Sequence, residues 1–395
     1  MLRTTWHQIR AARLTGPVVG VFTFYAAAGS ESYVALWHLV QSHSAATLGA
    51  GLVGRSLVTM TTPLILGHLE DRHPHWHRHF LVLAALALAT SVIPLGHSAL
   101  SLAIAPLLPA LAQSVFSQSS PRPFSVAPRL PVIIGWLIDG GKLVAGLLVL
   151  LSVHSTLLRA VLILSLSVIA VVSLWGTVER SAPRVVVDEP EAPALPLGRG
   201  DPRGWPRGLW ITFGFLTGAS YFSGFSYDLG LTWVGRNHVH LLALIIVVAS
   251  LGALLGTSAV LRSDHFRVTR VGWALLAFWL SPLLLDSRET ILEVFGALLF
   301  GFFAAYSGQP LRAMFWSCAP APQRSRLWAM SEFSNQGSAL VGQFLLALAY
   351  AHLSLGTLRL VAPLAGAALV IPTLVFQRWA LGDARHSSLD LRSPT

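Results

Sequence analysis

Charged residues are scarce in this chain of 395 residues, since Asp, Glu, Lys and Arg make up 11% of it. Soluble domains usually carry about 25%. Hydrophobic residues make up 54% of the chain, and no soluble fold of this size hides that much apolar surface from water. The shortage of charge therefore excludes a soluble domain and indicates a protein surrounded by lipid.

Cysteine is almost absent, because Cys318 is the single one. One cysteine excludes an intramolecular disulfide and any zinc or iron–sulfur site built from several thiolates. Catalytic signatures are missing too: no nucleophile–base set, phosphate-binding glycine loop or nucleotide motif stands in a context that supports catalysis. We therefore expect neither an enzyme nor an ATP-driven pump, and no permanently bound cofactor.

Long apolar runs, in contrast, recur along the whole chain. A bilayer core about 30 Å thick requires roughly 20 apolar residues per spanning helix. Twelve runs meet that length, at 15–40, 44–66, 79–96, 98–117, 131–153, 156–176, 208–234, 239–261, 270–286, 289–309, 327–351 and 354–377. The first run is longer than the core of a signal peptide and contains Glu31, so we interpret it as a membrane helix.

The stretch from Glu179 to Arg207 is rich in proline and charge, which is typical of an extended linker. The linker divides the predicted spans into two sets of six. The predicted fold is an all-α polytopic membrane protein with 12 transmembrane helices in two pseudo-symmetric bundles. Its predicted parts are an N-terminal bundle (1–178), a cytoplasmic linker (179–207), a C-terminal bundle (208–378) and a cytoplasmic tail (379–395).

Arginine is unevenly distributed about these spans. Lys142 is the only lysine, so 26 of the 27 basic residues are arginines; 21 fall on the side of the termini and linker, Arg55 lies within a span, and four lie opposite, namely Arg159, Arg236, Arg288 and Arg359. Basic residues collect in cytoplasmic loops. We therefore expect a multi-pass protein of the cell (inner) membrane with both termini in the cytoplasm. This topology also accounts for the net charge of +10 without a nucleic-acid partner.

The segment after the second predicted span, Gly67 to Arg78, reads GHLEDRHPHWHR. It resembles the Gly-x-Leu-x-Asp-Arg-x-Gly-Arg-Arg loop of the major facilitator superfamily, except that Pro74 stands at the second glycine. The resemblance implies the major facilitator fold and a secondary transporter that works by alternating access. It also implies a cytoplasmic gate formed by Gly67, Asp71, Arg72 and Arg78.

Three shorter segments resemble the ferroportin iron exporters. They are Ile138 to Ala145 in the fifth span, Ser263 to Trp273 after the eighth, and Gly224-Phe225 in the seventh. This resemblance implies export of a divalent metal, with Fe²⁺ as the first candidate substrate. Departures from the family's pattern in the first, seventh and eleventh spans argue against its second metal site.

Ionisable side chains inside membrane helices cost about 2.5–3.5 kcal/mol each on insertion scales, so each one needs a reason. The predicted substrate or ion pathway consists of Glu31, Arg55, Asp139, Lys142, Asp228 and Glu332. The candidate metal ligands among them are Glu31, Asp139 and Asp228. The alternatives are a structural hydrogen bond for Glu31, a neutralising Asp139–Lys142 ion pair and a solvated outer mouth for Asp228. Arg55 and Glu332 are expected to be structural or gating partners.

Lys142 follows Asp139 by three residues and so shares its helix face. A desolvated lysine can lose its proton whereas an arginine stays charged, so a lone lysine fits a titrating counter-charge. Separately, His68, His73, His75, His77 and His79 form either a divalent-metal site or a solvated basic segment beside the lipid headgroups.

The leading functional prediction is therefore export of Fe²⁺ or another divalent cation. The first alternative is proton-coupled efflux of a small organic solute, with H⁺ as the coupling ion. The second alternative is a non-transporting membrane receptor or scaffold. The expected partners are the lipid bilayer and a small-molecule or ion substrate, and we expect a monomer.

Overall fold

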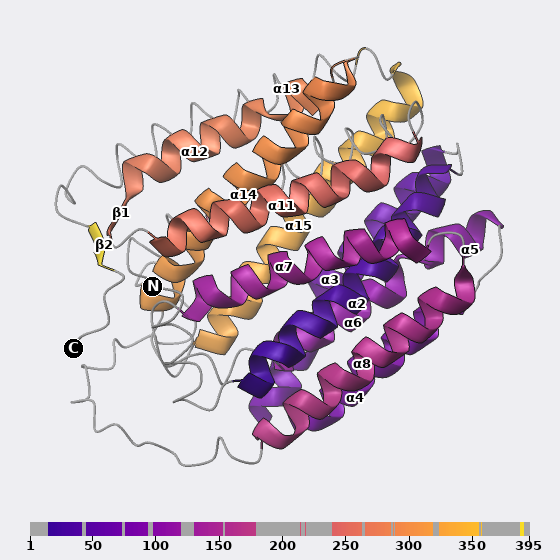
Figure 1. The fold of residues 1–395 in the computed structure, drawn as a ribbon, viewed down its shortest axis with the longest axis vertical. Helices are drawn as coiled ribbons and strands as arrows, with labels where there is room; N and C mark the ends of the chain where they lie inside the picture. Colours follow the sequence, from indigo (N-terminus) through magenta and orange to yellow (C-terminus); the bar gives the residue numbers. More distant parts are fainter. Residues whose placement is uncertain are drawn as a thin grey trace.

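A computed structural model of the chain (Figure 1) describes residues 15–41, 45–72, 76–93, 98–119, 130–152, 155–178, 214, 218, 239–262, 265–285, 287, 289–318, 324–354, 357 and 388–390. The described part is almost entirely helical. Its helices are α2 Thr15–Gln41, α3 Ala45–Arg72, α4 His77–Ser91, α5 Ala99–Ile104, α6 Leu107–Ser119, α7 Leu130–Ser152, α8 Thr156–Val178, α11 Val239–Arg262, α12 Val268–Leu280, α13 Pro282–Leu285, α14 Thr290–Cys318 and α15 Arg324–His352.

Ten of the twelve predicted spans coincide with these helices, and the predicted all-α class is confirmed. The linker at 179–207 lies outside the described residues, and so do the seventh and twelfth predicted spans apart from residues 214, 218, 354 and 357. One small departure is a two-stranded antiparallel ribbon, in which β1 (His265–Arg267) pairs with β2 (Ser388–Asp390). The described part contains six segments long and apolar enough to cross a membrane, by length and composition: Ala46–Leu66, Ala99–Ser117, Val132–Leu150, Leu157–Trp175, Leu244–Arg262 and Thr290–Arg312.

Prolines shape the helices in two different ways. The fourth predicted span is divided into α5 and α6 just at Pro106, and the ninth into α12 and α13 just before Pro282. Proline has no N–H to donate and its ring crowds the preceding turn, so a helix commonly breaks there. Pro310 instead lies inside α14, which continues to Cys318 beyond the predicted end at residue 309. As a result Arg312, predicted to lie in a loop, is a helix residue.

The helices form two groups that correspond to the two halves of the sequence (Figure 1, indigo to magenta and salmon to yellow). The groups meet where α7 packs against α11 and α14, and where α3 packs against α15. One apolar core lies within the first group and includes Phe24 of α2 stacked on Phe116 of α6. The second core joins α11–α14 to residues of α2 and α3, so it extends across the seam between the groups.

Within the second group, α11 and α14 approach each other closely through glycines. A Cβ atom at Gly252 or Gly256 of α11, or at Gly301 of α14, would clash with the backbone of the facing helix. Small residues at such positions are a common way for membrane helices to pack backbone against backbone.

This contact leads to a first prediction. Gly301→Ala should lower the free energy of unfolding by about 1–3 kcal/mol, because the added methyl group would press on the carbonyl of Ala249 and overpack the contact. The matched control is Gly308→Ala on the same helix, where no atom of the described residues lies within 4 Å of the added carbon. That variant should be neutral or more stable, since alanine favours helix over glycine. Thermal unfolding in detergent compares the two, and equal midpoints would contradict the packing.

Candidate functional site

A buried hydrogen bond crosses the seam between the two groups of helices. Thr257 of α11 donates from Oγ1 to Oδ2 of Asp139 on α7 over 2.8 Å. Asp139 is 8% exposed and Thr257 is fully buried. A carboxylate in such a place needs polar partners, because burying an unpaired charge is costly. Here its hydrogen-bond donor comes from the other half of the chain.

Further polar contacts follow the same face of α11. Nε1 of Trp136 on α7 donates to Oγ of Ser258 over 3.1 Å, and the hydroxyl of Tyr33 on α2 lies 3.4 Å from Oγ of Ser250. Ser250, Thr257 and Ser258 are spaced at i, i+7 and i+8, which places them on one side of a helix. This polar stripe of an otherwise apolar helix faces the first half.

Charged side chains from α3, α7 and α14 are electrostatic neighbours of Asp139 or of Lys142. Asp139 is an electrostatic neighbour of Lys142, one turn further along α7, and of Arg312 on α14. Lys142 is in turn a neighbour of Arg55 on α3. Asp139 receives its hydrogen bond from Thr257, and the described contacts include no direct ion pair between Asp139 and Lys142. We call Arg55, Asp139, Lys142, Thr257 and Arg312 the central cluster.

Gln309, on α14 of the second half, packs against α7 next to the central cluster. It lies one turn before Arg312 on α14, is 4% exposed, and occupies the space that a side chain at Gly135 of α7 would need. Its Oε1 atom is buried and has no hydrogen-bond partner among the described residues. An amide oxygen left unpaired in this way costs free energy. A donor supplied by a bound molecule would remove that cost.

A second seam lies between α3 and α15. Ser56 donates from Oγ to Oε1 of Gln343 over 2.6 Å, and Thr59 donates from Oγ1 to Oε1 of Gln336 over 2.9 Å. Both contacts join the first half to the second. The two halves are therefore held together at both seams by side-chain hydrogen bonds, in addition to apolar packing.

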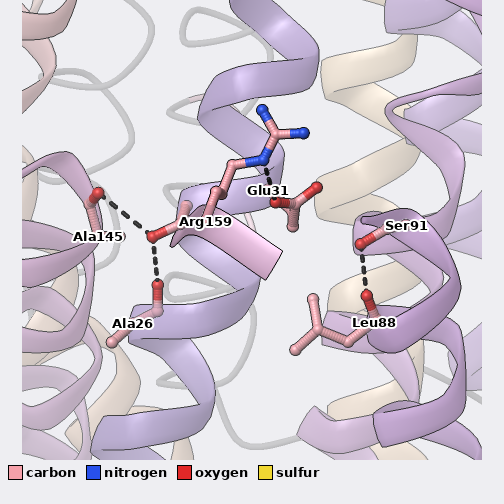
Figure 2. Close-up of polar contacts among 7 residues, drawn as sticks. Ala26, Glu31, Leu88, Ser91, Ala145 and Arg159 are labelled. Carbon is pink, nitrogen blue, oxygen red and sulfur yellow. Dashed lines mark hydrogen bonds and ion pairs between the residues drawn. The ribbon is translucent and has the colours of Figure 1, made fainter. Parts of the chain in front are cut away.

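Glu31 has a partner within its own half. Oε1 of Glu31 on α2 lies 3.2 Å from Nε of Arg159 in the first turn of α8, and both side chains are nearly buried (Figure 2). The neighbouring Ser30 faces α7 instead, where its Oγ donates to the carbonyl of Ala145 over 3.3 Å. Sequence reasoning placed Arg159 among residues outside the membrane and missed this ion pair. Its position inside the sixth predicted span could have indicated that Arg159 lies within the bundle and needs an acidic partner.

Glu31 and Asp139 are not brought together. Gly141 of α7 abuts Phe22 to Ala26 of α2, and Gly29 abuts Lys142 and Ala145, so α2 and α7 run in parallel with a fixed offset. By that offset Glu31 lies about eight residues further along the bundle than Asp139, or roughly 12 Å at 1.5 Å per residue. In this arrangement the two carboxylates therefore lie at different levels of the bundle.

The structure describes the remaining predicted pathway residues to different extents. Arg55 belongs to the central cluster. Asp228 lies outside the described residues, and Glu332 lies on α15 but its side chain is not described. Within the described part of the chain, no group of three or more His, Cys, Asp or Glu side chains could hold a metal ion. The metal site with Glu31, Asp139 and Asp228 therefore stays a prediction.

The predicted gate is only partly described. Gly67, Asp71 and Arg72 lie in the last turns of α3, which extends six residues past the predicted span, and their side chains are not described. Cζ of Arg78 lies 5.4 Å from the centroid of the Trp175 ring on α8, within the range of a cation–π contact. The gating role stays a prediction. Of the predicted histidine segment, His68 ends up in α3 and His77 in α4 without a described side chain, and the described side chain of His79 is exposed.

Neither a protein-family model nor a curated protein sequence matches the chain. Solved structures do. The human organic anion transporter TETRAN matches with a TM-score of 0.68 and 16% identity, over 93% of this chain and 99% of that one. The nucleoside transporter NupG matches with a TM-score of 0.61 and 13% identity, over 92% and 99%. A bacterial homologue of the iron transporter ferroportin, in an outward-facing state, matches with a TM-score of 0.62 and 16% identity, over 93% and 98%.

These likenesses cover nearly the whole chain and agree with the sequence motif at Gly67 to Arg78. At 13–16% identity they concern the fold. The chain is thus a multi-pass α-helical membrane protein with the major facilitator fold.

Proposed function

We propose that the chain is a secondary active transporter that works by alternating access, with the central cluster as its substrate site. The observation that carries this proposal is the buried Asp139–Thr257 hydrogen bond between α7 and α11. In transporters built from repeats, substrate and coupling-ion sites lie at the repeat interface near the bilayer midplane. Here the buried Asp139 and its partly buried charged neighbours lie at the interface of the two halves, where rocking would expose them to each side in turn.

The substrate that the described geometry supports best is a small organic solute, moved by proton-coupled efflux with Asp139 as the proton carrier. Asp139 is the acid of the central cluster, and its partner Thr257 moves with the other half. Protonation of Asp139 would therefore be coupled to the contact between the halves. Tyr33 and Trp136 add aromatic surface next to the charges, which suits an organic molecule.

Export of Fe²⁺ is the second candidate. It is favoured by the likeness of the fold to the bacterial homologue of the iron transporter ferroportin, and by the acid at Asp139. Purified protein in liposomes would then transport Fe²⁺ or Co²⁺, and Asp139→Ala would abolish the flux. Transport of organic solutes without any flux of these metals would exclude the metal candidate.

Alternating access is tested by distance measurements that need no substrate. The background is Cys318→Ser, which removes the only cysteine. Spin labels at Leu150→Cys on α7 and Leu244→Cys on α11 report on the seam, because both residues are exposed and lie toward the same end of the α7–α11 contact, beyond Gly146 and Val247. We expect two distance populations by pulsed electron paramagnetic resonance.

The control pair lies within one half. Labels at Leu150→Cys and Leu158→Cys connect α7 to α8, and both positions are exposed. This pair should show one distance under all conditions, because both helices belong to the same half. A single, unchanging distance for the pair across the seam, in detergent and in lipid, would contradict the proposed mechanism.

A further inference from the structure

We propose that the central cluster binds an organic anion, so that the substrate of the proposed transporter carries a negative charge. This inference rests on the proposed function and names the class of molecule that the site would take. It starts from the sum of the charges. With each side chain in its ordinary ionised form, Arg55, Lys142 and Arg312 contribute +3 and Asp139 contributes −1, which leaves +2 among the described side chains.

The excess positive charge has no counterpart nearby in the described part of the chain. Glu31 is paired with Arg159 at a different level of the bundle, so its carboxylate does not compensate the cluster. Excess charge inside a membrane protein is expensive unless it is paired. An anionic ligand supplies the missing negative charge. A divalent cation would instead meet three positive side chains and a single carboxylate.

The cations come from both halves of the protein. Arg55 and Lys142 belong to α3 and α7 of the first half, and Arg312 belongs to α14 of the second. An anion bound between them would attract both halves at once. Binding would thus favour the conformations in which the seam is closed around the ligand, which is how a substrate can drive a change of state through differential affinity.

The uncharged side chains near the cations suit an organic anion better than an inorganic one. Tyr33 is an electrostatic neighbour of both Arg55 and Asp139, so its ring belongs to the same region. Trp136 lies one turn before Asp139 on the same face of α7. Gln309 adds a buried amide oxygen without a partner among the described residues, which can accept a hydrogen bond from a ligand hydroxyl or amide. Cations for a carboxylate and aromatic rings for its apolar part are therefore close together.

The test compares carboxylates with amines and an alcohol of similar apolar parts, and with two inorganic ions. Calorimetric titration of the purified full-length protein uses benzoate, phenylacetate and hexanoate, the amines benzylamine and hexylamine, neutral benzyl alcohol, inorganic phosphate and Co²⁺. We expect the carboxylates to bind more tightly than the amines, the alcohol, phosphate and Co²⁺. If no carboxylate binds more tightly than its amine counterpart, or if phosphate or Co²⁺ binds most tightly, the proposal is overturned.

Variants then locate the binding. Lys142→Gln and Arg312→Gln should each weaken carboxylate binding at least tenfold, and Arg312→Lys should restore most of it because the charge returns. The matched control is Arg270→Gln, which removes an exposed arginine of α12 and should change affinity less than twofold. Size-exclusion chromatography and circular dichroism confirm that each variant is folded. Equal affinities in all variants would place the anion elsewhere and overturn the assignment.

The outcome is separable from that of the proposed transport function. Two distance populations across the α7–α11 seam with no preference for carboxylates would leave the transporter standing and remove the anion. Carboxylate binding that depends on Lys142 and Arg312, combined with one fixed distance across the α7–α11 seam, would keep the anion site and remove the alternating-access transporter.

Discussion

Glu31→Gln is expected to lower the free energy of unfolding by about 3–5 kcal/mol, because it leaves the nearly buried Arg159 without its counter-charge. The double variant Glu31→Gln with Arg159→Gln should recover most of that stability, since two neutral amides in the same place leave no unpaired charge. Unfolding in mild detergent by heat or by added dodecyl sulfate gives the comparison. The pair connects α2 to α8 within the first half, so the expected effect is on the stability of that bundle.

A nearby hydrogen bond of α2 provides the control for the Glu31–Arg159 pair. Ser32→Ala removes the hydrogen bond that Gln113 of α6 donates to the next side chain on α2, and it should cost only about 1 kcal/mol. If Glu31→Gln is as stable as the wild type but transport is lost, the structural reading of Glu31 fails and the predicted role in the pathway gains support.

Asp139→Asn is expected to abolish accumulation of substrate driven by a pH gradient, down to the level of empty liposomes. Asparagine can still accept the hydrogen bond from Thr257 but cannot carry a proton. The same change leaves three cations without an acid among the described side chains, so it should also cost about 3–5 kcal/mol of stability. Benzoate should bind more tightly to this variant than to the wild type, because the cluster becomes more positive.

A second variant separates the loss of stability from the loss of transport. Asp139→Asn combined with Lys142→Gln removes one charge of each sign and should regain most of the stability without regaining transport. Thr257→Val is the matched control for the hydrogen bond alone. Proton-driven accumulation in Asp139→Asn liposomes equal to that of the wild type would rule out Asp139 as the proton carrier.

The positions of most helices could be predicted from the sequence, because a spanning helix needs a long apolar run and such runs are easy to recognise. The ends were less predictable. The tenth predicted span ends at residue 309 because proline usually stops a helix, yet α14 passes through Pro310 to Cys318. A proline is tolerated where neighbouring helices support the freed backbone groups, and sequence does not show those neighbours.

The site was predictable in part for a similar reason. Asp139 and Lys142 could be found because ionisable residues in the middle of an apolar helix are rare. Arg312 and Arg159 were assigned to loops by the count of arginines, because each lies near the end of a predicted span. Leaving these two arginines out of the count changes it from 21 against 4 to 20 against 3, so the asymmetry that predicts the orientation remains. Which acid meets which base depends on how helices pack, as Glu31 and Arg159 show.

The glycine contact between α11 and α14 has a mechanical consequence. Two backbones that touch without intervening side chains cannot slide or tilt against each other without a steric clash, so α11 and α14 form the stiff part of the second half. The seams behave differently. Single hydrogen bonds such as Ser56–Gln343 and Trp136–Ser258 can break and re-form at low cost. Deformation during a transport cycle should therefore concentrate in these seams. The α11–α14 pair should move as one rigid body, so Thr257 and Arg312 should move together.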